Sequence, residues 1–288
     1  MFCKTSCHNL KPYKIDLHVH TTASDGCYTP REVVKLAHTL GITHLAVTDH
    51  DTTAGLKEAL AAGNEYGVEI IPGLELSTLY GEQEIHILGY YQNSACPALQ
   101  EPLGSLASLR VRRAEKIVKK LCEAGYPLSM AEVKKKSKTG TLGRPHIALV
   151  LIDHGWVNSI EEGFTKFLNP GCPGFVSRVR ISPLEAVSLI KKAGGVPVLA
   201  HPGGSFPADL WPFLLEAGLQ GVEVYHPVHT AELRRKYLQI AEANQLVITG
   251  GSDFHGHEGQ DLSYFGNMPV PPKTIQKLKE LAPDHILR

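Results

Sequence analysis

The chain has 288 residues, enough for one large domain or two ordinary ones, and 43% of them are hydrophobic. Its 29 Lys and Arg residues balance 29 Asp and Glu residues, which argues against a general polyanion-binding surface but not against a local basic pocket. No apolar run approaches the roughly 20 residues that span a bilayer, and the N-terminus lacks the apolar stretch of a signal peptide. We therefore expect a cytoplasmic protein without membrane contact.

The first part of the chain alternates strand and helix patterns. Residues 14–20 (KIDLHVH) predict a strand, Thr29-Pro30 predicts the start of a helix, and Gly41 predicts its end. Further strands are predicted at 44–48, 68–73 and 84–91, and a helix at about 54–66.

The pattern changes after Tyr91. Residues 105–125 predict a long amphipathic helix, and shorter helices are predicted at 129–138, 144–154 and 160–168. We expect residues 92–185 to form a helical insertion that covers the substrate.

Alternation then resumes with a helix at 183–193. Strands are predicted at 196–200, 221–225 and 246–250, and helices at about 230–243 and 272–281. Strands separated by helices favour parallel βα units, so we expect an α/β barrel over 14–91 and 186–288, after a tail at 1–13. An open doubly wound sheet is the alternative, although neither nucleotide-binding glycine fingerprint is present.

Histidines and acids lie at or beside the predicted strands: His18, His20, Asp49, His50, Glu75, His86, His201, Asp253 and His255. Each one alone has a structural explanation, such as a satisfied core histidine or a helix cap. In a barrel, however, the strand ends meet at one face, where so many buried imidazoles and carboxylates would be costly without cations. This many ligands would suit two or three divalent ions, with one carboxylate bridging.

Five motifs resemble those of the PHP (polymerase and histidinol phosphatase) family: DLHVHTTASDG (16–26), VTDHDT (47–52), GLELS (73–77), LAHPG (199–203) and GSDFHG (251–256). The segment 143–168 is similar to the insertion of a narrower group, the 3′,5′-nucleoside bisphosphate phosphatases and 5′→3′ exoribonucleases. The resemblance implies a distorted (β/α)7-type barrel.

The resemblance also implies a set of metal ligands. His18, His20, Glu75 and Asp253 would hold one ion. Glu75 would bridge to a second ion held by His86 and His201, and Asp25, His50 and His255 would hold a third. The family often has His at the position of Asp25. We expect Mn²⁺, with Zn²⁺ or Fe²⁺ as alternatives.

Such a pocket would carry net positive charge and match a phosphate dianion. We predict a metal-bound hydroxide as the nucleophile and in-line attack on phosphorus. Asp51, His226 and His257 are the candidate acid or base residues. Asp16 and Asp49 could either orient ligand histidines or cap turns.

The insertion supplies candidates for a second phosphate site. These are Arg144, His146, Lys166, Arg178 and Arg180, of which Arg144 and Arg178 stand out from surface arginines.

The sequence thus predicts a hydrolase that removes the 3′-phosphate of 3′,5′-nucleoside bisphosphates and also trims short RNA from its 5′ end. A histidinol-phosphate or other small phosphomonoester phosphatase is one alternative, and a non-catalytic metal-stabilised module is another. The expected partner is a small nucleotide or short oligonucleotide, without a stable nucleic-acid complex.

Overall fold

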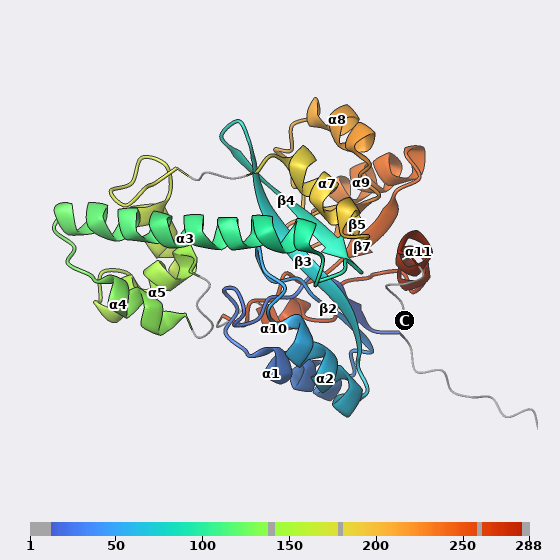
Figure 1. The fold of residues 1–288 in the computed structure, drawn as a ribbon, viewed down its shortest axis with the longest axis horizontal. Helices are drawn as coiled ribbons and strands as arrows, with labels where there is room; N and C mark the ends of the chain where they lie inside the picture. Colours follow the sequence, from blue (N-terminus) through green and yellow to red (C-terminus); the bar gives the residue numbers. More distant parts are fainter. Residues whose placement is uncertain (1–12, 138–141, 178–180, 258–260, 284–288) are drawn as a thin grey trace, which may run out of the picture.

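The computed structural model describes residues 13–137, 142–177, 181–257 and 261–283 (Figure 1). Its elements, in chain order, are β1 (Ile15–Asp16), α1 (Pro30–Thr39), β2 (His44–Val47), α2 (Leu56–Tyr66), β3 (Glu69–Tyr80), β4 (Gln83–Tyr90), α3 (Pro97–Glu123), α4 (Met130–Lys136), α5 (Arg144–Asp153), α6 (Ile160–Gly163), the π-helical turn η1 (Phe164–Leu168), α7 (Pro183–Lys192), β5 (Val196–Leu199), α8 (Leu210–Ala217), β6 (Gly221–Tyr225), α9 (Ala231–Ala243), β7 (Val247–Gly250), α10 (Asp261–Tyr264) and α11 (Lys273–Leu281).

The seven strands form one sheet in sequence order, β1 to β7. Its two edges approach each other, because the Leu17 N–H donates to the Gly250 carbonyl (3.2 Å) and the His20 N–H donates to the Phe254 carbonyl (2.8 Å). A parallel bridge between Val19 and Phe254 extends this contact. The expected distorted α/β barrel is therefore confirmed.

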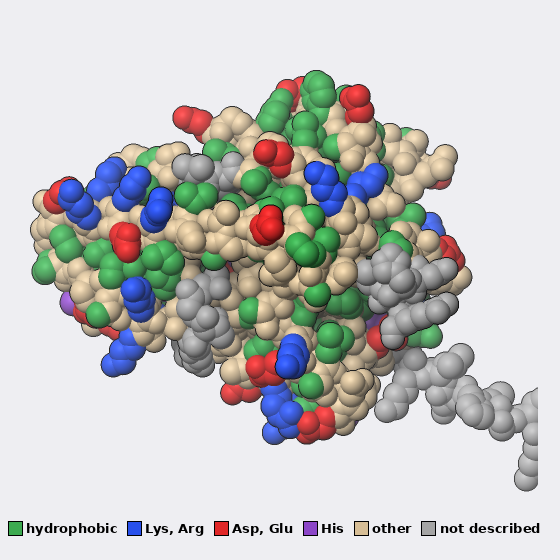
Figure 2. All heavy atoms as spheres, in the orientation of Figure 1, with side chains coloured by type: hydrophobic (Ala, Val, Ile, Leu, Met, Phe, Trp, Pro, Cys, Tyr) green, Lys and Arg blue, Asp and Glu red, His purple; other side chains and the backbone are tan. Residues whose placement is uncertain are grey.

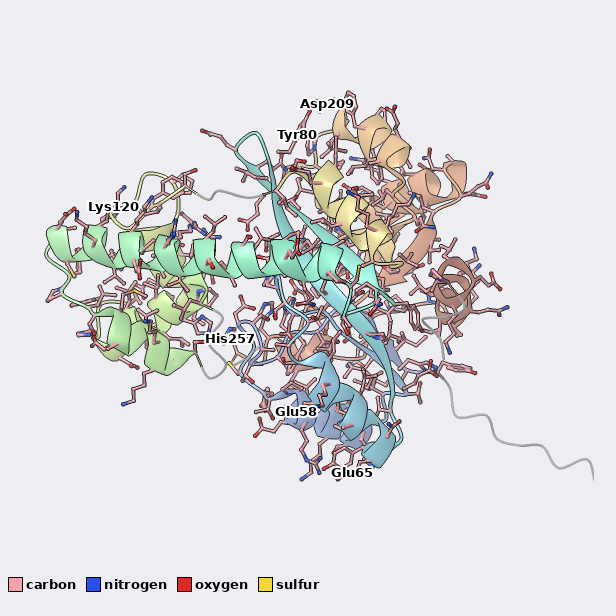
Figure 3. The ribbon with its side chains drawn as sticks, viewed as in Figure 1. Glu58, Glu65, Tyr80, Lys120, Asp209 and His257 are labelled. Atoms are coloured by element: carbon pink, nitrogen blue, oxygen red, sulfur yellow. The ribbon has the colours of Figure 1, made fainter. Side chains whose placement is uncertain are left out.

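The expectation of parallel strands throughout is wrong at β4, which runs antiparallel to both β3 and β5. The physical reason is a hairpin. β3 continues for 12 residues to Tyr80, and Tyr80 pairs with Gln83 across a two-residue turn in which Gly81 adopts φ 59°. The Tyr80 hydroxyl donates to Asp209 (2.9 Å), which joins the end of this hairpin to the start of α8 (Figure 3).

Capping boxes begin several helices, among them α1, whose start was predicted from Thr29-Pro30. Thr29 accepts from the Glu32 N–H, and the Glu32 carboxylate accepts from the Thr29 N–H, so both donors at the start of α1 are satisfied. Ser182 and Glu185 do the same for α7. α3 begins at Pro97, earlier than the sequence indicated, and α8 was not predicted.

Three hydrophobic clusters surround the sheet. One lies among Leu17, Leu88 and Tyr90 and includes residues of α11, a second packs α1 and α2, and a third packs α7, α8 and α9. These clusters fix the strand ends that carry the polar residues described below.

The helical region between the two parts of the barrel has its own apolar cluster, which includes Ile117, Leu121, Ile147 and Leu151. The first half of α3 instead packs on the barrel, and its second half extends away from it (Figure 1). The limits 92–185 for a separate insertion stay a prediction. Among the described residues, no helix is both long and apolar enough to cross a membrane.

Gly251 allows the closest approach across the barrel seam. A Cβ there would lie 2.4 Å from both the backbone nitrogen and the Cβ of His18. We predict that Gly251→Ala destabilises the protein by about 2 kcal/mol, because His18 would have to move. Thermal or urea unfolding would measure this.

Gly104→Ala is the matched control, because a Cβ on this α3 glycine meets nothing within 4 Å. That change should stabilise the protein by up to about 1 kcal/mol. Equal effects of the two substitutions would contradict the close approach at the seam.

Candidate metal centre

One mouth of the barrel collects polar side chains from six of its strands or the loops that follow them. His18, His20 and Asp25 follow β1, His50 follows β2, Glu75 lies within β3, His86 lies within β4, His201 follows β5, and Asp253 and His255 follow β7. The structure therefore brings together all nine residues that the sequence nominated as metal ligands.

Glu75 lies at the centre of this cluster and is fully buried. Its Oε1 is 2.8 Å from His86 Nδ1, and its Oε2 is 2.9 Å from His50 Nδ1. The imidazoles with a nitrogen within 3.4 Å of this carboxylate are His18, His20, His50, His86 and His201.

Two further acids complete the cluster. Asp253 Oδ1 lies 3.3 Å from His18 Nε2 and 3.1 Å from His20 Nε2. Asp25 Oδ1 lies 3.5 Å from His255 Nε2. Asp253 has φ 55°, an uncommon left-handed conformation for a residue other than glycine, so the surrounding structure must hold it in place.

Many of the inward-facing atoms are buried without a hydrogen-bond partner. They are His18 Nε2, both ring nitrogens of His20, Asp25 Oδ1, Glu75 Oε2, Asp253 Oδ1 and His226 Nε2. Native proteins rarely leave such groups unsatisfied, and imidazole with carboxylate is a common donor set for divalent ions. The residues present therefore fit bound metal ions.

The donor atoms fall into overlapping groups. In each of three groups they all lie within 4.8 Å of one another: His18, His20, Glu75 and Asp253; His50, Glu75 and His86; and His20, Asp25, His50 and His255. The first group matches the first predicted ion, and the third contains the set predicted for the third ion. His201 joins the predicted second set through its contact of 3.0 Å with Glu75.

The charges of the cluster are strongly coupled. Burial lowers the pKa of His255, but Asp25 and Asp253 outweigh burial and raise it to about 10. Burial lowers the pKa of His50 to about 4 despite the nearby carboxylates. Burial raises the pKa of Glu75, yet its imidazole neighbours hold it well below its ordinary value.

Sequence reasoning missed Glu223, a fully buried acid in the middle of β6. Its carboxylate accepts from His18 Nδ1 (3.1 Å) and from the His201 N–H (2.8 Å), so it orients one candidate ligand and the backbone of another. The sequence did contain a signal for Glu223, because an acid between Val222 and Val224 in an apolar strand is unusual.

Asp16 and Asp49 hold backbone and hydroxyl groups. Asp16 accepts from the Ser252 N–H (2.9 Å) and the Gly266 N–H (2.8 Å). Asp49 accepts from the N–H and hydroxyl of Thr21 and from the Ser24 hydroxyl. These contacts favour the turn-capping interpretation over the ring-orienting one.

The three acid or base candidates lie in different surroundings. His226 is buried, with Nε2 3.5 Å from Asp253 Oδ2. Asp51 accepts from Arg110 Nε (2.8 Å) and from the Ser77 N–H (2.8 Å). His257 Nδ1 lies 3.0 Å from Cys27 Sγ in the loop after β7 (Figure 3).

A cavity opens beside the cluster. Asp25, His50 and His86 line it together with Arg110 and Arg144, and so does Glu84, whose Oε2 lies 3.4 Å from Arg144 Nη2. Burial lowers the pKa of Arg144 to about 10, and its Nε is buried without a hydrogen-bond partner. Arg110 was not predicted, because an arginine on an amphipathic helix gives no signal of its own.

Two of the other predicted substrate-binding residues, His146 and Lys166, do not line this cavity. The buried His146 accepts from the Gly143 N–H (3.0 Å) and caps α5. Lys166 is exposed and pairs with Glu162. Arg178 and Arg180 lie outside the described residues.

A closed α/β barrel with these clustered imidazoles and acids at its mouth has the architecture of a metal-dependent hydrolase. The model of the PHP domain matches residues 16–176. The chain therefore belongs to the PHP family.

Three curated relatives match over most of their length. A 3′,5′-nucleoside bisphosphate phosphatase from Chromobacterium violaceum is 36% identical, covering 88% of this chain and 92% of the relative. A phosphoribosyl 1,2-cyclic phosphate 1,2-diphosphodiesterase from Eggerthella lenta is 36% identical, covering 85% and 95%. The 5′-3′ exoribonuclease Rnm from Escherichia coli is 34% identical, covering 83% and 84%.

A solved structure agrees with this family. A protein from Bifidobacterium adolescentis, assigned as a metal-dependent phosphoesterase, superposes with TM-score 0.90 at 30% identity, covering 96% of this chain and 99% of that one. Family, relatives and site together identify the chain as an enzyme that hydrolyses phosphoric esters. The alternative of a non-catalytic module is not supported.

We predict that Glu75→Gln removes most of the bound metal, because this side chain contacts five imidazoles and its charge would be lost. Elemental analysis of the purified protein would measure the metal-to-protein ratio. Glu69→Gln is the control, since Glu69 also lies on β3 but is far more exposed and pairs with Lys279. Equal metal content in the two variants would remove Glu75 from the ligand set.

The metal-free protein should lose thermal stability as the pH rises from about 7 to about 10. The pKa of His255 is raised from 6.5, its ordinary value, to about 10 in the folded protein. The proton on His255 therefore contributes its full stabilisation below pH 6.5, and this contribution is lost as the pH rises through about 10. Melting temperatures measured with a chelator present should fall by several degrees.

His255→Gln should flatten that profile. With metal bound, the melting temperature should instead rise with pH. Ligation requires neutral imidazole, so metal binds more tightly as the histidines lose their protons. If the melting temperature of the metal-free wild type stays constant over this pH range, His255 does not carry a stabilising proton there.

Proposed function

We propose that the enzyme hydrolyses the 3′-phosphate of 3′,5′-nucleoside bisphosphates, such as adenosine 3′,5′-bisphosphate, and trims short RNA oligonucleotides from the 5′ end. One observation supports this most strongly: a single cavity is lined both by candidate metal ligands and by two arginines. A substrate with two phosphates needs such a pair of anion sites.

The first anion site is the metal centre. We propose two or three divalent ions, Mn²⁺ in the first instance, held by the nine clustered residues. When bound, such ions supply positive charge to the phosphate and activate water. The overlapping donor groups support more than one ion, because Glu75 belongs to two of them.

The second anion site is formed by Arg110 and Arg144. Arg110 Nη2 lies 3.2 Å from Ser77 Oγ, and this serine hydroxyl is 3.3 Å from His50 Nδ1, so Arg110 is held close to the metal centre. Arg144 lies over the Phe164 ring (4.7 Å), and its Nη2 lies 3.4 Å from Glu84 Oε2, so a bound phosphate would replace this carboxylate as the partner of Arg144. A planar guanidinium suits bidentate recognition of phosphate.

Residues of this chain also position the reacting groups. Glu223 orients His18, and the buried His226 beside Asp253 is the candidate best placed to move a proton at the ester. Asp51 is engaged by Arg110, so we assign it to positioning α3 rather than to proton transfer.

The substrate can be decided by comparing phosphate release from three compounds. We expect the highest kcat/KM for adenosine 3′,5′-bisphosphate and lower values for histidinol phosphate and phosphoribosyl 1,2-cyclic phosphate. The last compound represents the Eggerthella lenta relative, whose identity to this chain is equally high. A higher kcat/KM for either of the other compounds would reassign the substrate.

We predict that Arg144→Ala raises KM for adenosine 3′,5′-bisphosphate at least about ten-fold, the effect of losing one charge-assisted hydrogen-bond pair. KM for an aryl phosphate, which has one phosphate group, should change by less than about two-fold. Arg235→Ala, an exposed arginine on α9, is the matched control. Equal increases for both substrates would remove the case for a second phosphate site.

A cytoplasmic location and the lack of a stable nucleic-acid complex remain part of this proposal. They would be tested by fractionation of the source cells and by gel filtration with RNA.

A further inference from the structure

Glu84 lines the cavity of the proposed two-phosphate site, but neither the metal centre nor the second anion site has so far given it a role. It lies two residues before His86 on β4, so the two side chains lie on the same face of the strand. Ile85 between them faces the other way and belongs to the apolar core. The strand thus places an acid directly beside a candidate metal ligand.

Glu84 contacts the ring nitrogen of His86 that faces away from the metal centre. His86 Nδ1 lies 2.8 Å from Glu75 Oε1, whereas His86 Nε2 lies 3.2 Å from Glu84 Oε1. An imidazole that ligates an ion through Nδ1 carries its proton on Nε2, and that N–H needs an acceptor. Glu84 supplies this acceptor. It therefore fixes the tautomer of His86 and makes Nδ1 a stronger electron donor.

The other oxygen of the same carboxylate contacts the proposed phosphate site. Glu84 Oε2 lies 3.4 Å from Arg144 Nη2. Arg144 begins α5, so this contact joins the β3–β4 hairpin to the helical region. The Arg144 side chain is only 15% exposed, and a guanidinium so far removed from water favours an anionic partner. Glu84 is such a partner in the free protein, and a substrate phosphate would have to replace it.

The two contacts of Glu84 draw on one negative charge. While Arg144 neutralises part of that charge, Glu84 is a weaker acceptor for the His86 N–H. A phosphate that takes over Arg144 releases Glu84 to His86, which then holds a cation more tightly. In the other direction, a cation at Nδ1 polarises the His86 N–H, draws Glu84 toward it and frees Arg144. Both effects have the same sign, as thermodynamic linkage requires.

We infer that Glu84 is a positioning residue that couples metal binding at His86 to phosphate binding at Arg144. The inference rests on the proposed function, because it takes Arg144 as the site of the second phosphate. It also deepens that function. A substrate whose second phosphate reaches Arg144 strengthens the metal centre that acts on its first phosphate, whereas a compound with one phosphate does not.

The test uses adenosine 5′-phosphate, which retains the second phosphate and has no 3′-phosphate to hydrolyse. Calorimetric titration measures its affinity for metal-free and Mn²⁺-loaded protein, and the affinity for Mn²⁺ is measured in the same way without nucleotide. Glu84→Gln removes the charge and keeps the shape of the side chain. Glu82→Gln is the matched control, because Glu82 is exposed in the turn of the same hairpin.

The control also corrects for long-range electrostatics. Figure 2 shows charged side chains of both signs on the surface over α3 and the hairpin, and these act on any anion that approaches. Both variants change the net charge of the protein equally. A difference between them therefore reports the contacts of Glu84 itself.

In the wild type, we expect Mn²⁺ to tighten the binding of adenosine 5′-phosphate at least about ten-fold, a usual size for such coupling. Glu84→Gln should reduce this ratio at least about three-fold. The metal-free variant should bind the nucleotide more tightly than the metal-free wild type, because Arg144 no longer has to leave a carboxylate. It should bind Mn²⁺ about ten-fold more weakly, because His86 loses a charged acceptor. A merely structural role for Glu84 would weaken both ligands together.

Three outcomes would overturn the inference. The ratio could be unchanged in Glu84→Gln, the two glutamate variants could behave alike, or Glu84→Gln could still change nucleotide affinity in an Arg144→Ala background, where the coupled partner is absent. The proposed function fails in a different way. If the wild type releases no phosphate from adenosine 3′,5′-bisphosphate while the coupling is present, the proposed function is refuted and the role of Glu84 is retained.

Discussion

The structure of this protein depends on one buried carboxylate. Glu75 lies within reach of five imidazoles while fully shielded from solvent. A buried cluster of this kind is stable only if protons or metal ions balance its charge, because unpaired buried charges are expensive. Protons do so on His255 when metal is absent, as its raised pKa indicates. Metal ions and protons would therefore compete for the same nitrogen atoms.

The antiparallel hairpin explains how Glu75 reaches this position. If β3 ended near residue 73, as its pattern suggested, Glu75 would lie in a loop. Instead β3 continues and pairs with β4, so that Ser77 is opposite His86 and Glu75 contacts His86 diagonally. The hairpin thus carries two site residues on rigid strands rather than on loops. Rigid support reduces the reorganisation that ligand binding would otherwise require.

The extent to which the sequence predicted this site follows from where its residues lie. His18, His50, His201 and Asp253 follow strands, so the convergence of strand ends was enough to group them. Glu223 and Arg110 were missed for different reasons. Glu223 lies inside a strand, and the sequence analysis looked for site residues only at or beside strand ends. Arg110 reaches the site only because α3 packs on the barrel, and this tertiary contact leaves no mark in the sequence. Lys166 shows the opposite case, since its motif neighbours lie near the cavity while its own side chain points to solvent and pairs with Glu162.

The contact between Asp51 and Arg110 connects the two halves of the proposed mechanism. Asp51 follows His50 directly, adopts φ 53°, and donates its N–H to the Glu75 carbonyl (2.9 Å). The same residue accepts from Arg110 on α3, which in turn reaches Ser77 on β3. A largely buried ion pair adds little net stability, but it fixes the register of the elements that it joins. Here it holds the cation-bearing face of α3 at a set position relative to the metal centre. In the proposed function, the barrel supplies the hydrolytic chemistry, and Arg110 and Arg144 from the helices beside it bind the second phosphate.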